Sequence, residues 1–216
     1  MISVLSGGAV QTFVQPLAAS FRGDRVKVEF QPMGKLVKTL AEGYPADVVI
    51  VTEEVLSRLK LKGEPIARVG VGVGVREGSP PPDISSVEAF RKTLLAAKSV
   101  TYMDPNIGTS GKHVAEVLSR LGILDQVLAK AKLGTGGQVA EAVGRGEVEL
   151  ALHQISEILP VKGVQLAGPL PPELQKYTVY VAAPVSSSTG AADFIGHLTS
   201  AQARSRLAPA GYTLPQ

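Results

Sequence analysis

Hydroxyl, glycine and lysine residues follow one another near the middle of the chain. A strand-like apolar stretch precedes them at 99–102, and apolar residues with the spacing of one helical face follow at 114–121. A helix should therefore begin among them, where its first amides lack partners and the helix dipole is positive. This pattern predicts a site for a negatively charged ligand, although a serine or threonine here could also be only a helix cap. The residues are Thr109, Ser110, Gly111 and Lys112.

Three further turns place glycine or another small residue between a predicted strand and a predicted helix. Glycine lets a ligand approach backbone amides closely, although ordinary turn geometry also explains a glycine at any one turn. The repetition favours several helix N-termini directed at one anion. The ligand-binding residues predicted at these turns are Ser6, Gly7, Gly8, Met33, Gly34, Lys35, Gly137 and Gln138.

A histidine and a glutamine follow the predicted strand 148–152, at the end where open α/β sheets place ligand groups. The imidazole of His153 could act as an acid or base, or it could bind a ligand or serve a structural role, and Gln154 is its neighbour. Glu157 could orient His153, or it could be a solvated residue of a short helix. His113, early in the central helix, is expected to point to solvent.

The composition restricts the class of protein. The chain has 216 residues, of which 44% are hydrophobic and 19% charged, and this is typical of a globular protein. The net charge of +3 comes from scattered residues, so nucleic-acid binding is not expected. No cysteine, paired-carboxylate motif, catalytic-triad order or metal-ligand spacing is present, and we therefore predict no metal site and no cofactor.

The first residues and the hydropathy pattern bear on location. No apolar run reaches the roughly 20 residues that a membrane helix needs, so no membrane insertion is expected. The start MISVLSGGAV enters a predicted strand without a basic segment and a cleavable apolar segment. The sequence as it stands predicts a cytoplasmic protein, or a periplasmic one if an export signal has been removed.

The predicted elements alternate between strands and helices, which favours an α/β fold in which each lobe has a mixed, mostly parallel sheet flanked by helices. Proline-rich segments at 80–82 and 169–172 indicate breaks between predicted elements, and the first is the clearest boundary in the sequence. The apolar run Arg68–Val75 is expected to be one strand that lies beside a strand at 177–183. The predicted lobes and hinge strands are 1–76 with 184–216 for lobe I, 77–183 for lobe II, and 68–76 and 177–183 for the hinge.

The order of these motifs resembles the molybdate-binding family of periplasmic solute-binding proteins. The motifs are SGGAV after the first strand, PADVVI at 45–50, DP at 104–105, TSG at 109–111 and GRGE at 144–147. The resemblance implies a two-lobed type II fold with a ligand cleft between the lobes, closing on an oxyanion held by hydroxyls and backbone amides without metal.

The same resemblance assigns roles to individual residues. Ser6 matches the first binding serine of the family, and Ser110 lies in the loop that gives a backbone amide. The second binding serine should fall within 31–34, where this chain has no hydroxyl. His153 falls near the position where the family has its binding tyrosine or another polar group.

Two main functions follow from this resemblance. The first is a solute-binding protein that closes on a small anion, either a molybdate-like oxyanion or a small carboxylate, with an ABC transporter permease as its partner if it is exported. The second is an isomerase of a small polycarboxylate, similar to aconitate isomerases, with His153 as acid or base. A ligand sensor that never meets a transporter is a third possibility.

Overall fold

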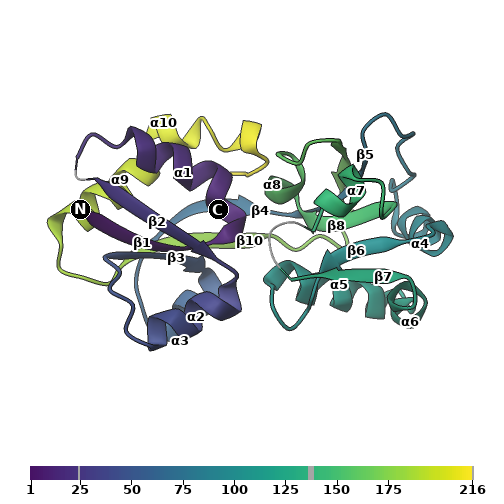
Figure 1. The fold of residues 1–216 in the computed structure, drawn as a ribbon, viewed down its shortest axis with the longest axis horizontal. Helices are drawn as coiled ribbons and strands as arrows, with labels where there is room; N and C mark the ends of the chain where they lie inside the picture. The colour runs from purple at the N-terminus through teal and green to yellow at the C-terminus, as the bar shows by residue number, and fades with distance from the viewer. Residues whose placement is uncertain (24, 136–138, 216) are drawn as a thin grey trace. The chain divides into compact units, whose positions relative to one another are not determined.

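The computed structural model describes residues 1–23, 25–135 and 139–215. The chain folds into two compact units, drawn in Figure 1, each of which contains one five-stranded sheet. Unit 1 consists of Met1–Val69 and Thr178–Gln216, and unit 2 consists of Gly70–Tyr177. The predicted architecture, two α/β units with mixed and mostly parallel sheets, is confirmed.

The sheet of unit 1 has the order β2-β1-β3-β10-β4. Strand β1 pairs in parallel with β2 and β3, and β10 pairs antiparallel with β3 and β4, so only β10 runs against the other four. Every residue of β3 is buried, which fits its position at the centre of the sheet. The strands are β1 (Ile2–Gly7), β2 (Val26–Gln31), β3 (Val48–Thr52), β4 (Glu64–Val69) and β10 (Thr178–Pro184).

Helices cover both faces of this sheet. Figure 1 shows α2 and α3 on one face and α1, α9 and α10 on the other. Leu36 of α2 and Val55 of α3 pack with Val49 and Val51 of β3, because the apolar stripe of each helix is buried against the strands. The helices are η1 (Gly8–Val10), α1 (Gln11–Ser20), α2 (Met33–Ala41), α3 (Glu53–Leu59), α9 (Thr189–Leu198), α10 (Ala201–Arg204) and η2 (Ala208–Ala210).

The sheet of unit 2 has the order β7-β6-β8-β5-β9, and here β5 is the strand that runs against the other four. Phe90, Leu94 and Val117 pack on one face in the larger core cluster, while Ala142 and Ile158 belong to a smaller cluster. The strands are β5 (Val71–Arg76), β6 (Val100–Met103), β7 (Ala131–Gly134), β8 (Leu150–Gln154) and β9 (Val164–Pro169). The helices are α4 (Val87–Ala96), α5 (Thr109–Arg120), α6 (Leu124–Leu128), α7 (Glu141–Gly144) and α8 (Ile155–Ile158).

The prediction of one continuous strand over Arg68–Val75 is wrong. The run is broken at Gly70, so β4 joins the sheet of unit 1 and β5 joins the sheet of unit 2. The Gln175 side chain accepts a hydrogen bond from Val71 N at 2.9 Å and donates one to Val71 O at 2.7 Å. This amide satisfies the backbone of Val71, the first residue of β5, with bonds that a continuous ladder would otherwise supply. Strand β10 does lie beside β4, with Thr178 opposite Val69.

Strand β7 is an element that the sequence pattern does not predict. Helix α6 ends at Leu128, and Ala131–Gly134 pairs in parallel with β6 at the edge of the sheet. The strand has only four residues and none of them is fully buried, so it lacks the apolar pattern by which a strand is recognised. Within the part of the chain that the structure describes, no helix is long and apolar enough to cross a membrane.

Candidate functional site

The start of α5 is built on a turn at the end of β6. Asp104 Oδ1 accepts hydrogen bonds from Asn106 N at 2.8 Å and Asn106 Nδ2 at 3.0 Å, and this turn leads into the helix. The N-cap is Gly108, and no side chain in the described part of the chain caps the helix. Ser110 is therefore not a capping residue, and its hydroxyl is available for another role.

Gly111 holds this helix start against the sheet. A Cβ atom at this position would overlap the carbonyl oxygen of Met103 and would lie 2.8 Å from the carbonyl carbon of the same residue. Backbone atoms cannot move aside as a flexible side chain can, so only glycine fits here. The close approach fixes the position of Ser110, the residue before it.

The structure brings Ser110 and His153 together, although they are 43 residues apart in sequence. The Ser110 hydroxyl lies 3.3 Å from His153 Nδ1, and the imidazole is fully buried within β8. Ser110 itself is only 6% exposed. A hydroxyl and an imidazole therefore meet at the N-terminus of a helix, where an anion is favoured.

Glu157 lies on the other side of the imidazole. Its Oε2 atom is 3.3 Å from His153 Nε2, and its side chain is 15% exposed. Among the described residues Nε2 has no aligned hydrogen-bond partner, so this approach is chiefly electrostatic. Burial raises the pKa of Glu157, and the neighbouring His153 opposes that rise. Ser110, His153 and Glu157 form a row that we call the relay row.

Unit 1 presents a different group of residues at the end of β1. Ser6 is fully buried, and its hydroxyl donates a hydrogen bond to Gly7 O at 3.1 Å. A Cβ at Gly7 would lie 2.8 Å from Met33 Cε and 3.2 Å from Tyr180 Cε1. The structure therefore places Gly7 and Met33 together, as two of the predicted site residues, and adds Tyr180 beside them.

Three buried residues with polar groups near these strand ends were not predicted from the sequence, namely Gln31, Thr52 and Tyr180. Gln31 ends β2, donates to Glu29 Oε1 at 2.6 Å and accepts from Thr39 Oγ1 at 2.9 Å. Thr52 ends β3 and its Oγ1 accepts a hydrogen bond from Val55 N at 3.3 Å, while Tyr180 lies opposite it in the sheet. A polar residue that closes an apolar strand was the signal that could have identified Gln31 and Thr52.

The remaining predicted site residues differ in how far they are buried. Gly34 and Lys35 are exposed in the first turn of α2, and Lys112 is exposed in that of α5, while Thr109 is half-buried. A Cβ at Gly8 would have no neighbour within 4 Å among the described atoms. Gln154 is buried and lies opposite Val71 in the sheet. Two predicted residues, Gly137 and Gln138, lie outside the described residues.

The expectation that His113 points to solvent is wrong. Its side chain is buried because it lies on the inner side of α5, and a hydrogen bond with the backbone of Leu174 holds it there. Burial lowers the pKa of His113, while the Leu174 bond opposes this change. In residues 1–23, 25–135 and 139–215, no group of three or more histidine, cysteine or acidic side chains is arranged to hold a metal ion.

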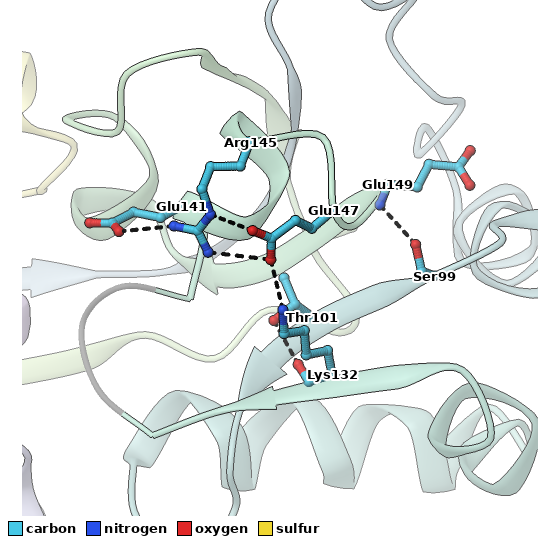
Figure 2. A network of polar contacts seen from close by, with 7 residues as sticks. All are labelled: Ser99, Thr101, Lys132, Glu141, Arg145, Glu147 and Glu149. Carbon is cyan, nitrogen blue, oxygen red and sulfur yellow. Dashed lines mark hydrogen bonds and ion pairs between the residues drawn. The ribbon is translucent and has the colours of Figure 1, made fainter.

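A surface network of charged residues fastens β7 to the turn after α7 (Figure 2). Glu147 accepts bonds from Lys132 Nζ at 2.7 Å and from Arg145 Nε at 2.6 Å, and Arg145 also reaches Glu141. Hydrogen bonds from Arg145 and Lys132 lower the pKa of Glu147 to about 2. Thr101 adds a bond from its hydroxyl to Lys132 O at 2.7 Å, which ties β6 to β7. The network supports the edge of the sheet and does not include the relay row.

Comparison with known proteins gives a consistent picture. A family model described as bacterial extracellular solute-binding protein matches residues 2–213. A protein named aconitate isomerase, from a Pseudomonas species, is 32% identical over 203 residues, covering 87% of this chain and 76% of that protein.

Solved structures show the same fold. The periplasmic molybdate-binding protein of Azotobacter vinelandii is similar with a TM-score of 0.77 and 19% identity, covering 100% of both chains. The sulfate-binding protein of Mycobacterium tuberculosis is similar with a TM-score of 0.74 and 20% identity, covering 98% of this chain and 85% of that one. The fold expected from the molybdate-binding family is therefore confirmed.

Proposed function

The chain belongs to the bacterial extracellular solute-binding protein family, and we propose that it binds a small anion, either a tetrahedral oxyanion or a small carboxylate. The observation that carries this proposal is the buried contact between Ser110 and His153 at the start of α5. The helix start supplies unpaired amides, Ser110 supplies a hydroxyl, and the buried imidazole holds that hydroxyl in place. Such a set of donors matches an oxygen-rich anion.

Residues of unit 1 form a second proposed set of ligand contacts. Ser6 offers a hydroxyl at the end of β1, and Gly7 and Gly8 follow it into η1. The open space around Gly8 allows a ligand to approach the backbone there. We include Met33, Gly34 and Lys35 from the start of α2 in this set of unit 1, and Thr109, Gly111, Lys112 and Gln154 in the proposed set of unit 2.

The first experiment is a thermal-shift screen with molybdate, tungstate, sulfate, phosphate and a series of di- and tricarboxylates. A ligand that binds only the folded chain raises its melting temperature, by an amount that grows with concentration. Ser110→Ala should reduce that shift, whereas Ser119→Ala, at an exposed position on the same helix, should not. The proposal fails if no anion stabilises the protein, or if Ser110→Ala responds as the wild type does.

A place in transport is part of the proposal. We propose that the chain acts in the periplasm and delivers its ligand to an ABC transporter permease. The family match supports this, because the matching model describes extracellular solute-binding proteins. Fractionation of cells that express the full-length gene, with detection of the protein in the periplasmic extract, tests the location directly.

A second function is favoured by the similarity to the protein named aconitate isomerase. In this alternative the site holds a small polycarboxylate and His153 moves one proton between carbon atoms of the substrate, so that the double bond shifts or changes geometry. Glu157 beside the ring could stabilise the imidazolium that forms. NMR of cis- and trans-aconitate incubated with the protein would show interconversion that His153→Gln abolishes. Absence of turnover with both isomers would exclude this alternative, and binding would remain as the proposed function.

A further inference from the structure

We propose that Glu157 is a positioning residue that acts through His153 on the hydroxyl of Ser110, so that binding of an anion at Ser110 takes up one proton. This inference rests on the proposed function and adds a property that anion binding alone does not require. It follows from the direction of the hydrogen bond between Ser110 and His153.

Among the described residues, the two ring nitrogens of the imidazole each have one polar neighbour. Ser110 Oγ lies 3.3 Å from Nδ1, and Glu157 Oε2 lies 3.3 Å from Nε2. The ring is fully buried, and packing of Gly111 on the backbone of Met103 fixes the Ser110 side of the contact. A buried ring of this kind cannot exchange either neighbour for bulk water without moving.

Without an added proton, the hydrogen bonds of the relay row disfavour the binding of an anion. An ionised Glu157 favours the tautomer of His153 that carries its hydrogen on Nε2, because a lone pair there would face the carboxylate. Nδ1 then accepts the hydrogen of the Ser110 hydroxyl. Ser110 is left with oxygen lone pairs to present to a ligand, and these repel an anion.

One added proton reverses this arrangement. If the proton binds His153, the imidazolium donates from Nδ1 to Ser110 Oγ. If it binds Glu157, the carboxyl group loses the charge that favours a hydrogen on Nε2, and the tautomer with its hydrogen on Nδ1 donates to Ser110 with the same result. In both cases the Ser110 hydroxyl hydrogen is released from His153 and can be donated to the anion.

Among the described residues, the charged groups on the neighbouring elements do not supply a competing partner for His153 or Glu157. The elements packed against β8 and α8 carry the titratable residues Arg76 on β5, Tyr102 on β6, Lys112, His113, Glu116 and Arg120 on α5, and Glu141 on α7. Arg145, beside α7, pairs with Glu141 and Glu147. Of the described residues, His153 is the one whose charge shifts the pKa of Glu157, and burial acts in the direction that favours proton uptake.

The test is calorimetric titration of the full chain with sulfate, molybdate and propane-1,2,3-tricarboxylate from about pH 7 to about pH 9, where these probes have no acidic proton left to lose. Each titration is repeated in buffers with different ionisation enthalpies. We expect uptake of about one proton per bound anion, and an affinity that falls by as much as about tenfold per pH unit.

Glu157→Gln provides the decisive comparison. Its neutral amide does not favour a hydrogen on Nε2, so Nδ1 can donate to Ser110 without an added proton, and binding should become independent of pH and of the buffer. Glu173→Gln removes a glutamate from an exposed position of the same unit and should retain the wild-type dependence. If Glu157→Gln fails to fold, the buffer dependence of the wild-type heat still decides the question.

The outcomes separate the two proposals. Anion binding without proton uptake, or a Glu157→Gln variant that keeps the wild-type pH dependence, overturns the role of Glu157 and leaves the binding function intact. Absence of binding by all three probes overturns both.

Discussion

The two units have sheets of the same design, and they differ in what stands at the ends of equivalent strands. In both sheets the third strand in the order is completely buried, β3 in unit 1 and β8 in unit 2. Strand β3 ends in Thr52, a neutral residue whose hydroxyl caps the next helix. Strand β8 ends in His153 and Gln154, and Glu157 follows in α8. The shared topology therefore places polar residues at equivalent strand ends in each unit, and in unit 2 these residues include titratable side chains.

The starts of the helices after β1 and β6 also differ. At Gly111 the helix packs backbone to backbone on the preceding strand, whereas Gly8 has open space where a side chain would extend. Glycine thus has a packing role in unit 2 and leaves an accessible backbone in unit 1. This difference produces the largest effect that we predict.

Gly111→Ala should lower the free energy of unfolding by about 3 kcal/mol, because the new methyl group would overlap backbone atoms of Met103. Gly8→Ala is the matched substitution in unit 1 and should change it by less than about 0.5 kcal/mol. Urea unfolding followed by circular dichroism measures both. Equal effects of the two substitutions would show that the tight packing at the start of α5 does not matter for stability.

The serines of the two units should differ in how their loss changes the pH dependence of binding. Ser110→Ala and Ser6→Ala each remove a hydroxyl from one of the two proposed sets of ligand contacts, and each should weaken anion binding by about tenfold. Ser6→Ala should keep the wild-type decline of affinity with pH, because its hydroxyl bonds to a backbone carbonyl. Ser110→Ala should lose that decline. Titration calorimetry at several pH values measures the affinity and its dependence on pH. Equal pH profiles for the two variants would contradict the predicted difference between the units.

Much of the fold could be predicted from the sequence because local patterns determine it. The apolar stripe over 114–121 predicted α5, and the start near Thr109 or Ser110 agrees with the observed bounds. The apolar stretch that leads to His153 likewise predicted a strand that ends at a polar pair. These features depend on residues that are close in sequence.

The features that sequence reasoning missed depend on tertiary contacts. The break between β4 and β5 needs the amide of Gln175, which is 104 residues from Val71. Strand β7 is stabilised by its neighbour and by Lys132 in the charged network, not by an apolar pattern of its own. The distance between Ser110 and His153 follows from the packing of α5 on the sheet, so no local pattern could reveal it.

Glu157→Gln should change how the stability of unit 2 depends on pH. Burial raises the pKa of Glu157 above its usual value of 4.5, so the folded chain holds this proton more tightly than the unfolded chain. The contribution of this group is full below pH 4.5 and is lost as the pH rises through the raised value. The wild type should therefore lose stability relative to Glu157→Gln over that range. Melting temperatures at a series of pH values measure this, and a constant difference would contradict the burial effect.

Glu147→Gln should have the smallest effect and the opposite dependence on pH. Bonds from Arg145 and Lys132 lower the pKa of Glu147 from 4.5 to about 2, so its contribution is present above pH 4.5 and is lost as the pH falls towards 2. The network is exposed and screened by salt, so the stability difference from the wild type should be slight and should shrink at high ionic strength. Acid unfolding at low and high salt measures this difference. Because Glu147 and Glu157 belong to the same unit, their opposite pH trends would separate the surface network from the relay row in a single set of measurements.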